Sequence, residues 1–259
     1  MESTVKLKSI SDGMGHIILN RPKSLNALNE EMLYELLEKL TVIENTSSYK
    51  TLIISGSGDN FAAGADLKQI SEMDAKTFEN YVRLIQEVTW KLEKIPILTI
   101  AAIQGVAYGG GLELALSCDF RFATPDSRFA LPEIRLGLIP GGGGTYRLTK
   151  LIGLAKAKKM LYTGSVIRAE EALQVGLLEK ITSEDHLIEE TIEFSNDITK
   201  KSAVAFRAIK ESASHAFDVD TYAARQMEVQ AILSVFSGDD CKEGIQAFIE
   251  KREPQFIRN

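Results

Sequence analysis

The sequence has few of the residues that build disulfide or metal sites. Its 259 residues include two cysteines and three histidines. Cys118 and Cys241 form no CxxC pair, and we interpret them as reduced thiols, buried as small apolar residues. His16, His186 and His215 are scattered along the chain, and motifs of the HExxH and GxSxG types are missing. We therefore expect no metal site and no nucleophilic serine of the α/β-hydrolase type.

The chain also lacks long apolar runs and an excess of basic charge. No stretch approaches the ~18 uninterrupted apolar residues of a membrane-spanning helix. Residues 1–8 alternate polar and apolar side chains, without the apolar core of a signal peptide. The net charge of −6 gives no electrostatic support for binding nucleic acid or a membrane surface. We expect a cytoplasmic protein with neither of these partners.

Short strands alternate with helices over the first half of the chain. Strands are predicted by apolar runs over 5–10, 16–19, 51–55, 95–103 and 120–123. The first two form a predicted hairpin with its turn at Asp12-Gly13. The run 95–103 is almost continuously apolar, which is typical of a strand covered on both faces. Amphipathic spacing predicts helices over 29–43, with Asn29 as N-cap, and over 78–94.

The second half reads as mainly helical, apart from a predicted strand near 177–181. Helices are predicted over 143–150, 154–162, 169–175, 184–201, 203–216, 219–236 and 240–251. The fold class is therefore α/β, with a core over 1–195 and a helical region over 196–259.

Three consecutive glycines, 109–111, precede an apolar helical run that contains one acid, Glu113. Glycines are costly in a helix, so three together need a reason. A helix N-terminus offers unpaired N–H groups, and glycine lets a substrate oxygen approach them. Gly110 and Glu113 would then supply an oxyanion donor with a carboxylate beside it. The alternative is that the glycines only allow close packing and Glu113 only favours a helix start.

Two other segments also combine glycines with groups that could take part in catalysis. Gly64 precedes a short helical run in FAAGADLKQI (61–70), where a second N–H donor would stabilise an enolate; a plain turn is the alternative. Glu133 follows Pro132 in an apolar setting, ahead of a glycine run at 141–144. Two buried carboxylates can hold a water between them and divide acid and base work. The glycine run is no phosphate loop, because no Lys-Ser/Thr follows it.

Over essentially its whole length the chain resembles the crotonase (enoyl-CoA hydratase/isomerase) family. The matching stretches are ILNRPKSLNALN (18–29), FAAGADLK (61–68), IAAIQGVAYGGGLELALSCDFRFA (100–123), FALPEIRLGLIPGGGGTYRL (129–148), LYTGSVIRAEEALQVGLLEKI (161–181) and DDCKEGIQAFIEKREPQF (239–256). The resemblance implies a crotonase-type spiral of repeated ββα units over 1–195, which binds acyl-CoA and carries out catalysis. It implies a helical C-terminal trimerisation region over 196–259, and hence a homotrimer or a hexamer of two trimers.

The resemblance also implies roles for individual residues. The N–H groups of Ala65 and Gly110 would form the oxyanion hole, and Glu113 and Glu133 would be the acid/base pair. Coenzyme A would be part of the acyl-CoA thioester substrate, with no separate cofactor. The residues implied to bind substrate are Lys23, Ser24, Leu25, Ala63, Ala65, Asp66, Leu67, Lys68 and Gly110, with Phe248 and Lys251 from a neighbouring subunit.

The implied reaction is reversible addition of water across the 2,3 double bond of a 2-enoyl-CoA. Both glutamates are present, as in the hydratases, whereas family members with other reactions often lack one. The alternatives are a branched-chain (methylglutaconyl-type) hydratase, a Δ3-Δ2-enoyl-CoA isomerase, and a non-catalytic RNA- or protein-binding scaffold. Tyr108 and Tyr146 stand where many hydratases carry Leu and Gln, which bears on the length of the acyl chain.

Overall fold

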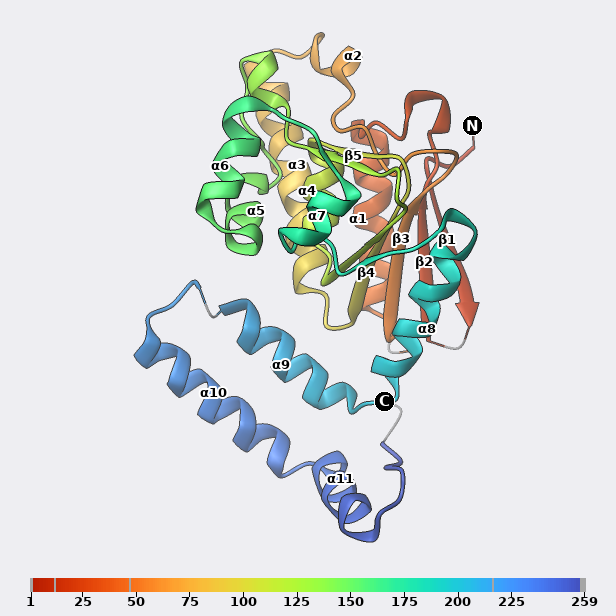
Figure 1. The fold of residues 1–259 in the computed structure, drawn as a ribbon, viewed down its shortest axis with the longest axis vertical. Helices are drawn as coiled ribbons and strands as arrows, with labels where there is room; N and C mark the ends of the chain where they lie inside the picture. The colour runs from red at the N-terminus through yellow and green to blue at the C-terminus, as the bar shows by residue number, and fades with distance from the viewer. Residues whose placement is uncertain (1, 12, 47, 216, 257–259) are drawn as a thin grey trace. The chain divides into compact units, whose positions relative to one another are not determined.

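The computed structural model describes residues 2–11, 13–46, 48–215 and 217–256. Its internal contacts divide the chain into two units, Met1–Ile192 and Glu193–Asn259. Figure 1 shows strands and helices in the first unit and helices in the second. The division falls close to the predicted boundary between 195 and 196, and the roles assigned to the two regions stay predictions.

The first unit is built on a six-stranded sheet in the order β1-β2-β3-β4-β6-β9. Its strands are β1 (Val5–Ser11), β2 (Met14–Leu19), β3 (Thr51–Gly56), β4 (Leu98–Ile103), β6 (Phe120–Ala123) and β9 (Lys180–Ile181). β1 and β2 are antiparallel, which confirms the hairpin, although Asp12 of its predicted turn lies outside the described residues. The other neighbouring pairs are parallel. β3 and β4 are buried along their whole length, as expected of strands covered on both faces.

A second, smaller sheet runs in the order β5-β7-β8. Its strands are β5 (Val106–Tyr108), β7 (Arg128–Ala130) and β8 (Ile167–Arg168). They are two or three residues long, too short for a periodic pattern, and the sequence did not predict them. Ala62 extends this sheet through a parallel bridge to Ala107.

The chain repeats one path through the two sheets. β4 enters the large sheet, β5 enters the small one, and α4 (Gly110–Leu116) follows. β6, β7 and α5 (Gly144–Ile152) then repeat the sequence. This is the spiral of ββα units that the resemblance implies, and each turn brings a loop to the small sheet.

Local sequence explains where the helices begin and end. The remaining helices of the first unit are α1 (Glu30–Glu44), α2 (Leu67–Ile70), α3 (Ala75–Lys94), α6 (Leu154–Thr163) and α7 (Ala169–Gln174), with short 3-10 turns η1 (Pro22–Ser24), η2 (Glu133–Leu136) and η3 (Glu184–His186). The side chain of Asn29 caps α1 as predicted. α3 begins three residues before its predicted start, because the Asp74 carboxylate caps it by accepting from the N–H of Thr77. Pro96 excludes helical geometry at Ile95, so α3 ends there and β4 starts at Leu98.

α1 and α3 contact each other and bury one face each in the core of the first unit. Their fully or almost fully buried residues are Met32, Leu33, Leu36, Leu40 and Ile43 on α1, and Tyr81, Leu84, Ile85, Val88 and Leu92 on α3. α3 also contacts α4, and α4 contacts α5. The glycine-rich starts of α4 and α5 are thereby brought close to each other.

The second unit begins within α8 (Leu187–Thr199) and continues through α9 (Ala203–His215), α10 (Thr221–Phe236) and α11 (Asp239–Glu250). α9 contacts α10, which contacts α11. The Ser202 hydroxyl donates to the buried Asp240 carboxylate at 2.6 Å and fastens the start of α9 to α11. Large apolar side chains of α10 and α11 are exposed in the single chain: Tyr222, Val229, Ile232, Leu233, Phe236, Ile245, Phe248 and Ile249. Across the described ranges, no helix combines the length and apolar character needed to span a membrane.

Candidate active site

The three glycines 109–111 occupy a crowded junction, and each has its own local reason. Gly109 has φ +49°, in the left-handed region that disfavours side chains. A β-carbon on Gly111 would lie 2.3 Å from the carbonyl oxygen of Ala62, which no side chain could tolerate. A β-carbon on Gly110 would meet only the ends of two flexible side chains, at 3.0 and 3.2 Å. Close packing thus explains much of the run, as the alternative interpretation proposed.

The two predicted oxyanion donors come together in the structure. A β-carbon on Gly110 would lie 3.8 Å from the backbone nitrogen of Ala65. Gly64 has φ +100°, and its own β-carbon position is 2.9 Å from the carbonyl oxygen of Tyr108, so the two loops meet backbone to backbone. Gly110 is the first residue of α4 and has no acceptor within the helix. Within the described residues, the backbone N–H groups of Ala65 and Gly110 donate to no hydrogen bond.

Glu113 lies in the first turn of α4 and is only 2% exposed. Its Oε1 accepts from the N–H groups of Gly142 and Gly144, each at 2.8 Å. Burial raises the pKa of this carboxyl group, while the two N–H donors and the charge of Arg147 act in the opposite direction. The glycine run therefore holds one oxygen of Glu113 and leaves Oε2 for other contacts.

Glu133 is the first residue of η2 and lies beside the same glycines. A β-carbon on Gly109 would be 3.0 Å from its Oε1. Its Oε2 is buried and has no hydrogen-bond partner among the described residues. Burial raises the pKa of Glu133 to about 7, and the charge of Glu113 adds to the effect. The structure thus brings the two predicted acids and the two predicted donors to one place, with unlike surroundings for the two acids.

A cavity of about 710 Å³ opens next to the loop that carries Ala65. It is lined by Arg21, Lys23, Ser24, Leu25, Ala27, Asn29, Asp66, Leu67, Lys68, Gln69 and Glu72. Six residues predicted to bind CoA are in this lining, and neither Ala63 nor Ala65 is. Ala63 donates its N–H to the Leu25 carbonyl at 2.9 Å, so it shapes the wall of the cavity from behind.

The last two predicted CoA contacts belong to the second unit. Phe248 on α11 is 85% exposed in the single chain. Lys251 follows α11 with φ +57° and forms its C-cap. Their predicted role in the substrate site of a neighbouring subunit stays a prediction.

Two residues that shape the cavity were not recognised from the sequence. Arg21 donates to the Asp66 carboxylate at 2.9 Å and joins the two walls. Asn26 is fully buried with φ +55°, and its side chain bonds the N–H of Arg21 and the carbonyl oxygens of Ser57 and Asn60. An Asn within a turn is a recognisable signal for left-handed geometry, which could have indicated this position.

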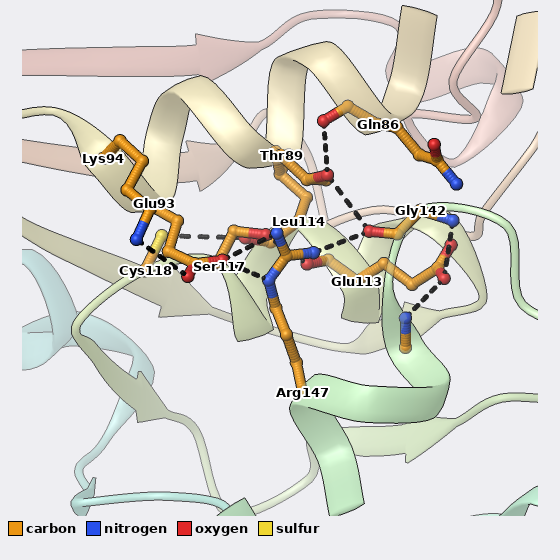
Figure 2. A network of polar contacts seen from close by, with 11 residues as sticks. Gln86, Thr89, Glu93, Lys94, Glu113, Leu114, Ser117, Cys118, Gly142 and Arg147 are labelled. Carbon is orange, nitrogen blue, oxygen red and sulfur yellow. Dashed lines mark hydrogen bonds and ion pairs between the residues drawn. The ribbon is translucent and has the colours of Figure 1, made fainter. Parts of the chain in front are cut away.

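The loop that holds Glu113 is itself fixed by a polar network (Figure 2). The carbonyl oxygen of Gly142 accepts from the Arg147 guanidinium at 2.7 Å and from the Thr89 hydroxyl at 3.0 Å. Arg147 forms an ion pair with Glu93 at 2.7 Å. No local sequence pattern indicates this network, because its side chains come from α3 and α5 and bond groups more than fifty residues away.

Two further properties bear on the predicted chemistry. Among the described residues, no group of three or more His, Cys, Asp or Glu side chains is arranged to hold a metal ion. The hydroxyl of Tyr146, one of the two departures from the hydratase pattern, lies 2.8 Å from the β-carbon position of Gly143. Tyr146 therefore lies directly beside the loop that holds Glu113.

Comparisons with known proteins agree with this architecture. The enoyl-CoA hydratase/isomerase family model matches residues 9–259, and the chain belongs to that family. It is 39% identical to a crotonyl-CoA hydratase of Syntrophomonas wolfei, over 93% of each chain. It is also 39% identical to a mitochondrial enoyl-CoA hydratase of Pongo abelii, over 94% of this chain and 83% of that one. A crystal structure of an enoyl-CoA hydratase from Bacillus anthracis superposes with a TM-score of 0.94 at 38% identity, over 99% of this chain and 100% of that one. The predicted crotonase-type fold is thereby confirmed.

Proposed function

We propose that this protein is an enoyl-CoA hydratase, which adds water reversibly across the 2,3 double bond of a 2-enoyl-CoA to give a 3-hydroxyacyl-CoA. The observation that carries the proposal is the meeting of buried Glu113 and part-buried Glu133 with two backbone N–H groups that donate to no hydrogen bond within the described residues. The relatives named as enoyl-CoA and crotonyl-CoA hydratases support it.

The two N–H groups act on the thioester oxygen. When water attacks C3, the π electrons of the double bond move toward the carbonyl, and negative charge develops on its oxygen. Donors at Ala65 and Gly110 that are already in place stabilise this enolate without reorganisation. A site of this kind needs no electron acceptor, because hydration changes no overall oxidation state, so we propose that no cofactor is required.

The unlike surroundings of the two acids suggest different tasks. Glu113, with two N–H donors and a nearby guanidinium, is the better site for negative charge. Glu133, whose Oε2 has no partner among the described residues, is the better site for the proton. In hydration Glu113 takes a proton from the attacking water. The oxygen of that water bonds to C3, and Glu133 delivers a proton to C2. The reverse direction returns both protons and releases water.

The coenzyme A part of the substrate is placed in the cavity beside Ala65. Lys23 and Lys68 form no ion pair among the described residues, so both charges are available to phosphate groups. The polar lining of this cavity joins directly to the loop that carries the oxyanion donor, which lets the thioester reach Ala65.

A homotrimer or a hexamer of two trimers is part of the proposal. α10 and α11 expose many large apolar side chains in the single chain, and exposed apolar surface of this kind supports a subunit interface there. Phe248 and Lys251 would reach a neighbour's substrate from this region. Among the described residues Cys118 and Cys241 form no disulfide, which is in keeping with a reducing compartment such as the cytoplasm.

The test is a hydration assay that follows loss of the absorbance of the conjugated enoyl thioester. We expect Glu113→Gln and Glu133→Gln each to lower kcat by about 10² or more, which is the range for removing a general acid or base, with substrate binding largely kept. Binding is measured separately with a saturated acyl-CoA that cannot react. Near-normal turnover in either variant would remove that residue from the mechanism.

The same preparation separates the competing activities. Straight-chain and branched 2-enoyl-CoA substrates and a 3-enoyl-CoA are supplied in parallel, and the products are identified by mass and chromatography. A hydrated straight-chain product supports the proposal. Shift of a double bond without hydration would indicate an isomerase, and tight binding without turnover would indicate a binding scaffold.

A further inference from the structure

Arg147 is a buried charge that the catalytic steps do not use. It lies on α5 with 7% of its side chain exposed. Nε donates to Glu93 at 2.7 Å, and Nη1 donates to the carbonyl oxygen of Gly142 at 2.7 Å. Burying a guanidinium is costly unless its donors are satisfied, so these contacts fix its position closely.

The backbone around Gly142 is held from both sides. The peptide group between Gly141 and Gly142 accepts from Gln86 through its carbonyl at 2.9 Å and donates to Glu113 through its N–H at 2.8 Å. The carbonyl of the next peptide group accepts from Arg147 and Thr89. Peptide groups are planar, so the Gln86 contact also fixes the direction of the Gly142 N–H, while the Arg147 and Thr89 contacts fix the orientation of the peptide group between Gly142 and Gly143.

A run of four glycines cannot supply this order by itself. Glycine has no side chain to restrict φ and ψ, so the segment 141–144 needs outside contacts to keep one conformation. Gly143 has φ +100°, and a β-carbon there would lie 2.1 Å from Nη1 of Arg147. The guanidinium thus fills the space beside Gly143, which lies between the two residues whose N–H groups hold Glu113.

We propose that Arg147, anchored by Glu93, is a positioning residue for Glu113: it holds the 141–144 loop so that the N–H groups of Gly142 and Gly144 stay directed at Oε1. Arg147 contacts neither the reacting atoms nor the oxyanion donors. This inference rests on the proposed function, since it assigns Glu113 the role of base.

The role has two components that substitutions can separate. The positive charge of Arg147 favours the ionised form of Glu113, against the effect of burial. The fork of the guanidinium holds Gly142 and Glu93 at once, which a lysine ammonium cannot reproduce. Arg147→Lys therefore keeps the charge and loses the geometry, whereas Arg147→Met loses both.

The chain offers a matched control in Arg121 on β6. Its side chain is 3% exposed and pairs with Glu179 at 2.6 Å. It also donates to the carbonyl oxygens of Leu177 and Cys118, each at 2.8 Å. None of these partners belongs to the 141–144 loop that holds Glu113. Substitutions at Arg121 therefore report what losing a buried arginine does to stability alone.

The experiment compares Arg147→Lys, Arg147→Met, Arg121→Lys and Arg121→Met in the full chain, by thermal midpoint, kcat, KM and the pH profile of kcat/KM. We expect Arg147→Met to lower kcat by about 10- to 100-fold, the range for a misplaced catalytic group, with KM little changed. The acidic limb of its pH profile should move to higher pH, because the positive charge that lowers the pKa of Glu113 is lost. Arg147→Lys should lower kcat with a smaller movement of the limb. The Arg121 variants should lower the thermal midpoint and leave kcat and the pH profile of kcat/KM unchanged.

The inference is overturned if the Arg147 and Arg121 variants behave alike in kcat and pH profile at comparable loss of stability. If Arg147→Met does not fold, Glu93→Gln decides the matter: a lower kcat at unchanged KM supports the anchor, and an unchanged kcat overturns it. Failure of the proposed function is seen separately, as a lack of hydration by the unmodified chain or full activity in Glu113→Gln.

Discussion

At the scale of single residues, the two glutamates show how surroundings can give one chemical group two different proposed roles. Glu113 is almost fully buried and Glu133 is part-buried, and burial raises the pKa of each. Glu113 has two backbone donors, from the 141–144 loop, that compensate its charge. Glu133 has none on Oε2 among the described residues, so its proton exchanges near neutral pH. The sequence indicated the pair, and it could not indicate the difference, which depends on a loop thirty residues away.

The oxyanion role of Gly110 can be tested without moving its neighbours far. Gly110→Ala keeps the N–H, and the closest neighbours of its β-carbon would be side-chain ends at 3.0 and 3.2 Å, with the Ala65 nitrogen at 3.8 Å. Gly110→Pro removes the N–H at the first position of α4, which is the position where a helix tolerates proline. We expect Pro to lower kcat by about 10²–10³, as for loss of one oxyanion donor, and Ala to lower it much less. Circular dichroism and thermal midpoints check that both variants fold. Equal turnover in the two would remove Gly110 from the oxyanion hole.

At the scale of elements, long periodic segments were predictable and short ones were not. α1 and its cap at Asn29 follow from the amphipathic spacing and a recognisable N-cap residue. β5, β7 and β8 are too short to show a period, yet they form the small sheet from which α4 and its glycines begin. The 710 Å³ cavity likewise depends on two separate loops joined by Arg21 and Asp66, a pairing that no local pattern reveals.

The loop 21–29 is the element whose shape should control binding of coenzyme A. Asn26 holds it through three hydrogen bonds from a left-handed conformation. Asn26→Ala leaves these part-buried groups without their partner, at a cost of up to about 1–3 kcal/mol for each group left fully unsatisfied. We expect KM for the enoyl-CoA to rise with a smaller change in kcat. The control is Asp74→Ala, which removes the cap of α3 at a cost of about 1 kcal/mol. An unchanged KM for the Asn26 variant, at a comparable loss of stability, would separate the loop from substrate binding.

At the scale of the whole molecule, the family and the fold followed from motifs spread along the chain, and both are confirmed. The oligomeric state stays a prediction, because the structure of a single chain shows only which of its surfaces are apolar and exposed. Removing the residues after Gly238 deletes α11 with Phe248 and Lys251. We expect this truncation to break the oligomer and to weaken coenzyme A binding together, measured by light scattering and by titration with a saturated acyl-CoA. A full-length protein that is monomeric at assay concentration would contradict the proposed assembly.

Two groups of the first unit, buried His16 and part-buried Glu133, should make stability depend on pH in opposite directions. Burial, with a smaller effect of the Lys8 charge, lowers the pKa of His16 from 6.5 to about 4. The folded protein prefers neutral His16, so this contribution is complete above pH 6.5 and is lost as the pH falls toward 4. Glu133 has its pKa raised from 4.5 to about 7, so the folded protein prefers its protonated form. Its contribution grows as the pH falls from 7 to 4.5 and partly offsets the loss at His16.

Glu133→Gln removes one side of this balance and leaves the other. The free energy of unfolding of the variant should therefore fall more steeply than that of the unmodified protein as the pH decreases from 7 to 4.5. His16→Asn should have the reverse effect and give a flatter curve between pH 6.5 and 4. Denaturant unfolding at several pH values and one fixed protein concentration measures both, since assembly also contributes to stability. Parallel curves for the three proteins would mean that neither group changes its proton affinity on folding.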